Sequence, residues 1–516
     1  MQTFKIKAIP TIVTAVISLV IIASVLLSLL PPPKEAQASD TSADVVVTST
    51  ATSLPLDVLM LLSQAEQAIG EKNYSKAIEA YSKVIELVPD HTPAYSQRSK
   101  AYMALRLYKL AIEDINTAIE LSNENDQLLE QRADLYVLTN DHAKAIEDYT
   151  ELIDQNPGGI EIYSKRAIAY MQSGDNNRAL ADLDHVILNA PNEANAYINR
   201  ALLFERLNKL EEALTDYTRA IELAGSTAGN AYARRGMIYS RLNKLTEALD
   251  DFEHAIDQGT EDATLYNERG LVYSKLGQAE QALANFNKAL MLDSQNPNIY
   301  YNRGVIYIYL KNYPLAIADY DQAIQLDPNN ALYYSNRGIA RYRNNQLDQA
   351  LADYDLAIKL DPEYVLNYQS RANAYAQNHQ TDLAIQDYSM VIELDSEYSE
   401  AYYNRGVLYY QLKKFDLALT DFNTIIEKEM PNMGQAFYMR AIIEIVRQQY
   451  TPALNDLTSA IERDAQFASS YYTRALVYKW FGKRSEAVAD LKQYIQLETD
   501  PNLLKQAEEL LDGLDG

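Results

Sequence analysis

The sequence contains no cysteine, one tryptophan and five histidines, and only 17 glycines and 16 prolines occur among its 516 residues. Without cysteine the chain can form neither disulfides nor thiolate-ligated zinc or iron–sulfur sites, and it has no cysteine nucleophile. The low numbers of glycine and proline argue against a fold built from many short strands and tight turns. Together these absences favour a fold made of helices.

Basic side chains are also scarce relative to acidic ones. Lys and Arg number 46 against 71 Asp and Glu, which gives a formal net charge of −25. A polyanion gains nothing from releasing the counterions of a phosphate backbone, so this balance argues against nucleic-acid binding. Hydrophobic residues make up 47% and charged residues 23% of the chain, which is not the composition of a disordered protein.

The first thirty residues differ in composition from the rest. Residues 9–30 include no charged side chain, and as a helix this run would be about 33 Å long, against a hydrocarbon core of about 30 Å. Lys5 and Lys7 precede the run, which places the N-terminus in the cytoplasm and the remainder of the chain outside it. We therefore expect residues 1–30 to form one N-terminal hydrophobic helix that anchors the chain as a single-pass membrane protein.

A cleaved signal sequence is the alternative for this segment. Ala36-Gln37-Ala38 fits a cleavage site, and cleavage after Ala38 would give a secreted protein. The apolar run is longer than the roughly 7–15 residues usual in signal peptides, which favours the anchor. Residues 31–57 are rich in Ser, Thr, Ala, Val and Pro without a helical period, which indicates a flexible linker.

One motif recurs through the rest of the chain. When its arginine is numbered position 7 of each unit, position 20 is alanine in all thirteen units, from Ala77 to Ala487, and position 8 is always Ala, Ser or Gly. Position 11 is tyrosine in nine units, and position 24 is always large and mostly aromatic. This self-similarity indicates a repeat protein. The arginines are spaced by 34 residues, or 35 in two places: Arg98, Arg132, Arg166, Arg200, Arg235, Arg269, Arg303, Arg337, Arg371, Arg405, Arg440 and Arg474.

The spacing within each unit predicts two helices. Positions 4, 8 and 11 lie on one stripe of a first helix, and positions 17, 20, 24 and 27 lie on one stripe of a second. Small residues at positions 8 and 20 let the two backbones approach, and the aromatic residues at positions 11 and 24 fill the space beside them. Asp327-Pro328 and Asp361-Pro362 are the clearest ends of second helices. One such pair cannot bury its own apolar face, so neighbouring pairs must stack.

This pattern resembles the tetratricopeptide repeat over thirteen units, residues 58–501, and the unit at 297–330 is nearest to the family pattern. The resemblance implies an all-α fold, a right-handed superhelical α-solenoid of about thirteen helix pairs whose first helices line a concave groove. After the last unit, residues 502–516 are predicted to form a C-terminal capping helix. Its apolar stripe consists of Leu503, Leu504, Ala507, Leu510 and Leu511.

Charges pair at two positions of the repeat. Position 23 is Asp in eleven of the twelve units that have the arginine, and Asn285 occupies it in the other. Opposite charges at a fixed spacing predict a ladder of Arg–Asp pairs between the two helices, each contributing at most about 1 kcal/mol where exposed. The alternative is an arginine array that grips an anionic ligand.

In the family, positions 2, 5, 9, 12 and 13 of the first helices tend to line the groove. Six acidic and six basic residues fall there, so we expect a neutral groove, with the net charge mainly on the outer face, the turns and the closing helix. Tyrosine and tryptophan gather in its C-terminal half, where they either bind a partner or pack on neighbouring helices. The candidate partner-binding residues are Tyr301, Tyr309, Tyr342, Arg343, Tyr403, Tyr410, Tyr438, Tyr472 and Trp480.

Two units have a charge in place of the tyrosine at position 11, namely Arg341 and Glu444. Arg341 belongs to a small basic cluster with Arg337 and Arg343. This cluster either accepts an acidic partner segment or extends its side chains to the edge of the stack.

No sequence motif for catalysis occurs. The chain lacks HExxH, G-x-S-x-G, P-loop and G-x-G-x-x-G sequences, and its histidines fall in different units at scattered positions. We expect no enzyme activity, cofactor or metal. The predicted function is a protein–protein interaction scaffold that binds an extended protein or peptide segment in the groove. The alternative is a carbohydrate-binding or polysaccharide-export accessory protein that uses the tyrosine-rich groove.

Overall fold

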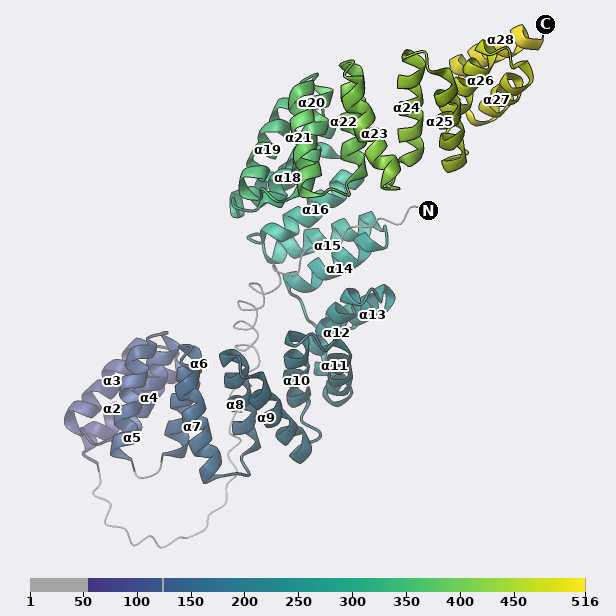
Figure 1. The fold of residues 1–516 in the computed structure, drawn as a ribbon. Helices are drawn as coiled ribbons and strands as arrows, with labels where there is room; N and C mark the ends of the chain where they lie inside the picture. The colour runs from purple at the N-terminus through teal and green to yellow at the C-terminus, as the bar shows by residue number, and fades with distance from the viewer. Residues whose placement is uncertain (1–53, 123–124, 516) are drawn as a thin grey trace. The chain divides into compact units, whose positions relative to one another are not determined.

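A computed structural model describes residues 54–122 and 125–515 of the chain (Figure 1). These residues form α-helices and one short 3₁₀ helix, η1 (Gly225–Thr227), and no strand occurs among them. The contacts define two compact units, which divide between Ser122 and Asn123. The predicted hydrophobic helix over residues 1–30 lies outside the described residues. Across the described part of the chain, no helix is long and apolar enough to cross a membrane.

The helices come in thirteen consecutive pairs. The first helices are α2 (Leu56–Gly70), α4 (Thr92–Ala104), α6 (Asp126–Leu138), α8 (Ile160–Ser173), α10 (Ala194–Arg206), α12 (Gly229–Arg241), α14 (Ala263–Lys275), α16 (Pro297–Tyr309), α18 (Ala331–Arg343), α20 (Val365–Gln377), α22 (Ser399–Gln411), α24 (Met433–Val446) and α26 (Ala468–Trp480). The second helices are α3 (Tyr74–Leu87), α5 (Tyr108–Leu121), α7 (His142–Gln155), α9 (Asn176–Asn189), α11 (Leu210–Ala224), α13 (Leu245–Asp257), α15 (Ala279–Leu292), α17 (Tyr313–Leu326), α19 (Leu347–Leu360), α21 (Thr381–Leu394), α23 (Phe415–Glu427), α25 (Tyr450–Arg463) and α27 (Arg484–Leu497). One further helix, α28 (Pro501–Asp515), follows.

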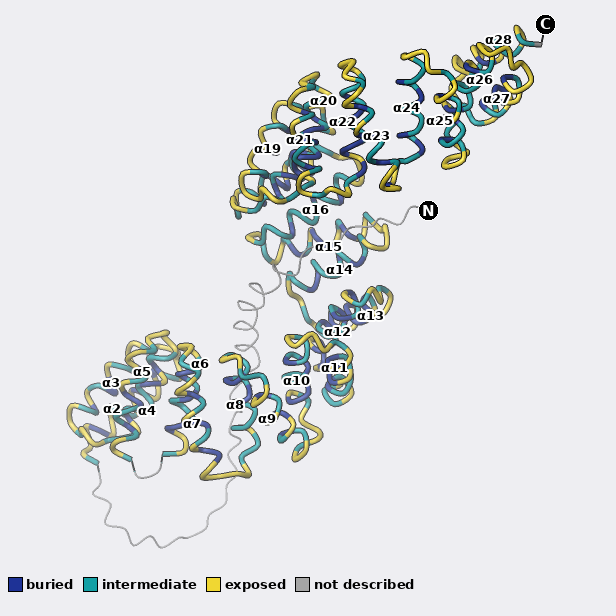
Figure 2. The backbone as a smooth tube through the Cα atoms, in the orientation of Figure 1, coloured by how far each residue is buried: buried dark blue, intermediate teal, exposed yellow. Residues whose placement is uncertain are grey.

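The core of each pair is the seam between its two helices. All thirteen alanines at position 20 are fully buried. Five units have glycine at position 8, and each of these glycines lies against the aromatic ring at position 24 of the same unit. Buried residues follow these seams, whereas the turns are largely exposed (Figure 2). The all-α fold and the pairwise packing agree with the predicted fold class.

Every first helix ends in the same turn, shown here for α16. Lys311, at position 15, has a φ of 59°, and positive φ recurs at this position in all thirteen units. The backbone N–H of Lys311 donates to the carbonyl of Ile308 (2.9 Å), and that of Asn312 donates to the carbonyl of Tyr307 (2.8 Å). These two bonds satisfy the last carbonyls of the helix. The Asn312 side chain then caps α17 by accepting from the backbone N–H of Leu315 (3.4 Å).

The last helix closes the stack as the sequence pattern predicts. Ala507 of α28 is fully buried, and Leu510 and Leu511 pack against the apolar cluster that includes Leu491 of α27. Leu503 is 43% exposed and lies outside this contact. At the other end, α2 begins at Leu56, two residues before the predicted start of the first repeat.

Candidate functional site

An Arg–Asp pair joins the two helices in eleven of the thirteen units. Arg303 donates from Nε to Oδ2 of Asp319 (2.9 Å) and from Nη2 to Oδ1 of Asp319 (2.6 Å). The predicted ladder is therefore confirmed, with the difference that its aspartates are buried, because their side chains are between 2% and 9% exposed. The other ten pairs are Arg98–Asp114, Arg132–Asp148, Arg166–Asp182, Arg200–Asp216, Arg235–Asp251, Arg337–Asp353, Arg371–Asp387, Arg405–Asp421, Arg440–Asp456 and Arg474–Asp490.

Ten of these guanidinium groups, that of Arg98 and those from Arg166 to Arg474, also donate to a side chain of the preceding repeat. Nη1 of Arg303 donates to Oδ1 of Asn287 (2.6 Å) in the preceding unit. The guanidinium lies between the rings of Tyr300 and Tyr307, 5.7 and 6.0 Å from their centroids. Hydrogen bonding to Asp319 raises the pKa of Arg303, which keeps its charge in place. With its donors and both faces engaged, this arginine is a structural element, and the geometry argues against an array that grips an anionic ligand.

The first helices of neighbouring repeats contact each other, for example α12 with α14, α14 with α16, and α16 with α18. We use the name first-helix face for the surface formed by positions 2, 5, 6, 9, 12 and 13 of the first helices from α8 to α26. Most of its side chains are half-buried. It corresponds to the predicted groove positions, with position 6 added.

Four candidate tyrosines lie at position 5 of this face, and each packs against another ring. The centroid distances are 5.5 Å for Tyr301 and Tyr333, 6.1 Å for Tyr403 and Phe422, 5.0 Å for Tyr438 and Phe467, and 5.0 Å for Tyr472 and Tyr494. All four candidates are half-buried. Part of each ring is therefore used in packing against another ring, in a tilted or edge-on arrangement.

The other candidates lie at the C-terminal ends of their helices. Tyr342 and Tyr410 are half-buried, and the guanidinium of Arg343 is exposed, 6.0 Å from the ring centroid of Tyr342. Tyr309 is 51% exposed and Trp480 is 61% exposed. The structure thus brings Tyr342 and Arg343 together, and Tyr403 and Tyr410 of α22 pack on one apolar cluster.

Trp480 differs from the other candidates in its surroundings. Its ring centroid lies 4.1 Å from that of Tyr450 in α25 and 5.0 Å from that of Phe481 in the following turn. Trp480 therefore contacts the turns that join first to second helices. This places it at the margin of the first-helix face rather than at its centre.

Charges of both signs meet on the first-helix face between α10 and α14. Burial raises the pKa of Glu205 and of Glu268, and neighbouring cations oppose both shifts. Arg234 and Arg241 act on Glu205, and Lys275 and Arg241 act on Glu268. The hydroxyl of Tyr217 donates a hydrogen bond to Glu205. These groups largely offset one another, in keeping with the neutral charge count of the predicted groove.

Position 6 is a part of the face that the sequence reasoning missed. Asn302 donates to Oδ1 of Asn267 in the preceding repeat (3.0 Å), and Asn336 donates in the same way to the hydroxyl of Tyr301 (3.5 Å). Lys165 forms an ion pair with Glu130 (2.6 Å) in the corresponding geometry. These contacts could have been predicted from the sequence. The residue at position 6 has a hydrogen-bonding or charged group that suits the residue at position 5 of the preceding repeat, 35 residues earlier.

Helix α20 gives the face a polar segment. Gln369, Asn373 and Gln377 occupy positions 5, 9 and 13, so they form one stripe of amides. Asn373 accepts a hydrogen bond from the hydroxyl of Tyr388 (2.6 Å). Gln369 is 6% exposed, and its Oε1 has no hydrogen-bond partner within the described part of the chain. Gln377 is the exposed amide of this stripe, whereas the Oε1 of Gln369 is buried and cannot be reached from solvent.

The basic cluster around Arg341 is organised differently from both sequence interpretations. Nη1 of Arg341 donates to Oδ2 of Asp353 (2.8 Å), the same carboxylate that pairs with Arg337. Arg341 and Arg337 both have side chains below 20% exposure, at 18% and 14%. Two of the three arginines thus belong to the ladder, and Arg343 alone of this cluster is exposed.

Among the residues that the structure describes, no group of three or more His, Asp or Glu side chains is placed to hold a metal ion. Two surface hollows border residues 482–488 and the outer side of α11 around Leu214 and Arg219. Neither hollow is lined by residues of the first-helix face.

Sequence profiles of known families agree with this architecture. Profiles of the tetratricopeptide repeat match residues 96–160, 194–226, 229–258, 297–330, 331–364 and 399–429. A further profile, described as TPR repeat, matches residues 273–308 and 372–413. Together the matched ranges span more than half of the sequence. The chain belongs to the tetratricopeptide repeat proteins.

Individual relatives are similar over parts of the chain. Sperm-associated antigen 1 of Mus musculus is 38% identical over 71 residues, which is 14% of this chain and 8% of that protein. The solved structure of YrrB, a tetratricopeptide repeat protein with an unusual peptide-binding site, shows 28% identity and a TM-score of 0.34 over 37% of this chain and 97% of that one. A tetratricopeptide repeat protein from Parabacteroides merdae shows 20% identity and a TM-score of 0.42 over 49% of this chain and 99% of that one.

Proposed function

We propose that this chain is a non-catalytic scaffold that binds an extended segment of a partner protein along its first-helix face. A role in protein interaction is supported by the repeats themselves, because stacked helix pairs present long binding surfaces. The observation that carries the proposal is the row of half-buried polar and aromatic side chains on this face. The Arg–Asp ladder and the alanine seams hold each helix pair together without the exposed side chains of this face, such as Arg343 and Gln377, which are left for a partner.

The composition of the face supports a peptide over a sugar. Sugar rings stack on open aromatic faces, whereas the position-5 tyrosines already contact other rings of the protein at tilted or edge-on angles. A peptide main chain instead needs hydrogen-bond donors and acceptors, and the exposed amide of Gln377 on this face supplies both. Arg343 beside Tyr342 adds a cation that suits a carboxylate of the partner.

A pair of charge reversals tests the position of the binding surface. Arg343→Glu changes the first-helix face, and Lys359→Glu makes the same change of charge on the exposed side of α19. The partner is captured from the native host with the full chain and identified by mass spectrometry. We expect Arg343→Glu to weaken capture of that partner and Lys359→Glu to leave it unchanged. Equal capture by both variants, or loss with Lys359→Glu alone, would contradict the proposal.

We further propose that residues 1–30 anchor the chain in a membrane and that the repeats lie outside the cytoplasm. The support is the uncharged run at residues 9–30 and the two lysines that precede it. Sequencing the N-terminus of the protein purified from its host tests the anchor, because a chain that starts at Ser39 has lost it. Protease added outside intact cells should cut the repeats if the proposed orientation holds.

A further inference from the structure

The turns that join first to second helices in the last three repeats are unusually basic for so acidic a chain. We define the C-terminal turn edge as residues 410–417, 445–452 and 479–486. It contains two carboxylates, and both are engaged: Asp416 pairs with Arg447 (2.7 Å), and Glu486 accepts from Ser485 (2.7 Å). Its six cations are all exposed: Lys413, Lys414, Arg447, Lys479, Lys483 and Arg484.

Apolar side chains are exposed among these cations. Trp480 is 61% exposed, Val446 is 50% exposed, Leu417 is 48% exposed and Phe481 is 40% exposed. Single exposed apolar residues are ordinary, but a contiguous set ringed by polar groups marks an interaction surface. The combination of tryptophan, aliphatic residues and cations is the feature to be explained.

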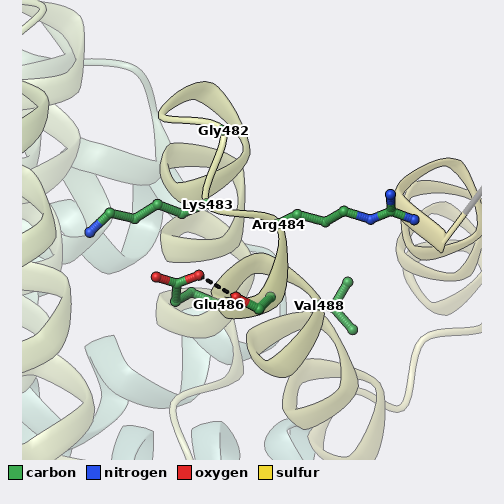
Figure 3. Close-up of a pocket in the computed structure, with 6 residues that line it drawn as sticks. Gly482, Lys483, Arg484, Glu486 and Val488 are labelled. Atoms are coloured by element: carbon green, nitrogen blue, oxygen red, sulfur yellow. Dashed lines mark hydrogen bonds between the residues drawn. The ribbon is translucent and has the colours of Figure 1, made fainter.

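The three turns form one continuous edge, at the end of the chain labelled α22 to α27 in Figure 1. Arg447 of the second turn lies 6.0 Å from the ring centroid of Phe415 in the first turn and pairs with Asp416 there. Tyr450 of the second turn stacks on Trp480 of the third, with centroids 4.1 Å apart. In the third turn, Lys483 and Arg484 project in opposite directions, and the Glu486 carboxylate lies on the side of Lys483 (Figure 3).

The opposite edge of the same repeats has the reverse charge. The turns after the second helices α23, α25 and α27 contain the cations Lys428 and Arg463 among six carboxylates: Glu427, Glu429, Glu462, Asp464, Glu498 and Asp500. The cations are therefore concentrated on one edge. A random scatter of basic residues does not account for this separation.

We propose that the C-terminal turn edge docks on an anionic lipid surface. Its cations are spread over three turns, and Lys483 and Arg484 border a surface hollow. This spread suits a flat and diffuse negative charge better than a single carboxylate-bearing helix or peptide. Tryptophan and tyrosine prefer the headgroup region, where an apolar ring and a polar group are both accommodated. Basic residues near such a surface are attracted to its anionic lipids. This edge shares only the last residues of α22, α24 and α26 with the first-helix face, and it does not depend on the proposed anchor.

The only tryptophan in the sequence, Trp480, lies on this edge, so its fluorescence reports on the site directly. The full chain is mixed with vesicles of phosphatidylcholine, with or without about one third phosphatidylserine, at low salt. We expect a blue shift of the emission and protection from acrylamide with the anionic vesicles alone, both lost at about 1 M salt, where the Debye length is about 3 Å. Binding through the N-terminal run would not by itself move Trp480 into the lipid.

Two triple variants with the same change in net charge test whether the cations of the C-terminal turn edge, rather than the charge of the whole chain, cause lipid binding. The test variant is Lys413→Glu, Lys414→Glu and Lys483→Glu, and the control is Lys209→Glu, Lys244→Glu and Lys311→Glu. Lys209, Lys244 and Lys483 each lie over an aromatic ring in their turns, at 5.9, 5.7 and 5.7 Å, so the positions are equivalent. We expect the test variant to require at least about tenfold more anionic lipid for the same shift, and the control to behave as wild type. Circular dichroism checks that both variants remain helical.

Three outcomes would overturn the proposal. The first is an emission that anionic vesicles leave unchanged while the protein co-floats with them. The second is an equal shift with neutral vesicles, or an equal loss in both triple variants. The third is a shift caused by a polyglutamate peptide and not by vesicles, which would assign the edge to an acidic protein partner.

Discussion

Gly304 of α16 lies directly against the ring of Tyr320 in α17, so close that a Cβ atom on Gly304 would be 2.8 Å from Cε1 of that ring. Tyr320 is fully buried, so the ring has little space into which it can move. The same contact joins Gly338 to Tyr354, with a distance of 2.7 Å. The size of position 8 is therefore coupled to the residue at position 24.

This contact predicts that Gly304→Ala destabilises its repeat by about 1–3 kcal/mol, the usual cost of overpacking a core. The matched control is Gly70→Ala, because a Cβ at Gly70 would meet no atom within 4 Å. Hydrogen exchange of the α16 and α17 amides measures the local loss, since repeats in a solenoid open separately. Adding Tyr320→Leu should restore part of the protection from exchange, because a smaller side chain at position 24 leaves space for an alanine at position 8. One natural repeat already has this combination, Ala167 with Leu183. Unchanged exchange in Gly304→Ala would contradict this account.

The one irregular rung of the Arg–Asp ladder gives a second prediction. Arg269 donates to Oδ1 of Asn285 (2.7 Å), and the amide nitrogen of Asn285 donates to the carbonyl of Gln281 (2.8 Å). Asn285→Asp should give Arg269 a two-bond ionic partner and stabilise this repeat by about 1 kcal/mol at neutral pH. Asp319→Ala should have the opposite effect, about 3–5 kcal/mol, because it leaves a partly buried arginine without its charge partner. Thermal unfolding tests both predictions: the melting temperature should rise with Asn285→Asp and fall with Asp319→Ala.

The turns after the first helices give a third prediction. Lys311 has a φ of 59°, a conformation that costs a side chain with a Cβ more than it costs glycine. Lys311→Gly should therefore raise the free energy of unfolding by up to about 1 kcal/mol, even though glycine makes the unfolded chain more flexible. Gly277, at the equivalent position with a φ of 74°, serves as the reverse test, and Gly277→Ala should lower stability. The same sign for both substitutions would be inconsistent with the turn geometry.

A buried amide gives a fourth prediction. Asn367 is fully buried, and neither Oδ1 nor Nδ2 has a hydrogen-bond partner within residues 54–122 and 125–515. An unsatisfied buried polar group costs about 1–3 kcal/mol. Leu265 fills the same position 3 in α14 and is fully buried there. Asn367→Leu should therefore raise the melting temperature, and a fall would indicate that the amide has a role that the apolar residue cannot replace.

Glu444 should make stability depend on pH. Burial, together with the nearby Asp456, raises the pKa of Glu444 from 4.5 to about 7, against the opposing effect of Arg440. The unfolded chain therefore loses this proton at a lower pH than the folded chain. The contribution of Glu444 to the free energy of unfolding is therefore fully present below about pH 4.5. It decreases as the pH rises and is lost above about pH 7.

The loss should be on the order of 1 kcal/mol, because solvent screens this half-buried carboxylate. Glu444→Gln keeps a neutral side chain at every pH, so its melting temperature should change less between pH 6 and pH 8 than that of the wild type. Equal changes in the two proteins would show that Glu444 does not titrate in this range.

The helix pairs could be predicted from the sequence alone, because small, aromatic and charged residues recur at the same positions in each repeat. It also predicted the contact of Arg303 with Asp319, since opposite charges recur at a fixed separation. It did not predict that the aspartate is buried or that Nη1 reaches Asn287 in the preceding repeat, because contacts between repeats depend on how the pairs stack. For the same reason the rung between Asn302 and Asn267 was missed.

The candidate site was predicted less completely than the fold. Positions taken from the repeat placed Tyr342 and Arg343 together on the first-helix face, as the structure has them. The pattern could not show that Tyr403 is covered by the ring of Phe422, or that Trp480 stacks on Tyr450 at the turn edge. Burial of an aromatic side chain depends on its neighbours in three dimensions, which a position number does not record.

Site-specific photo-crosslinking in the native host tests the central claim, that the first-helix face binds the partner. A benzoyl-phenylalanine replaces Tyr342 on this face in one full-length variant and Met291, which is 82% exposed on α15, in the other. The account predicts that the variant at position 342 crosslinks one extended segment of a partner protein and that the variant at position 291 does not. A partner that crosslinks at position 291 and never at position 342 would contradict it.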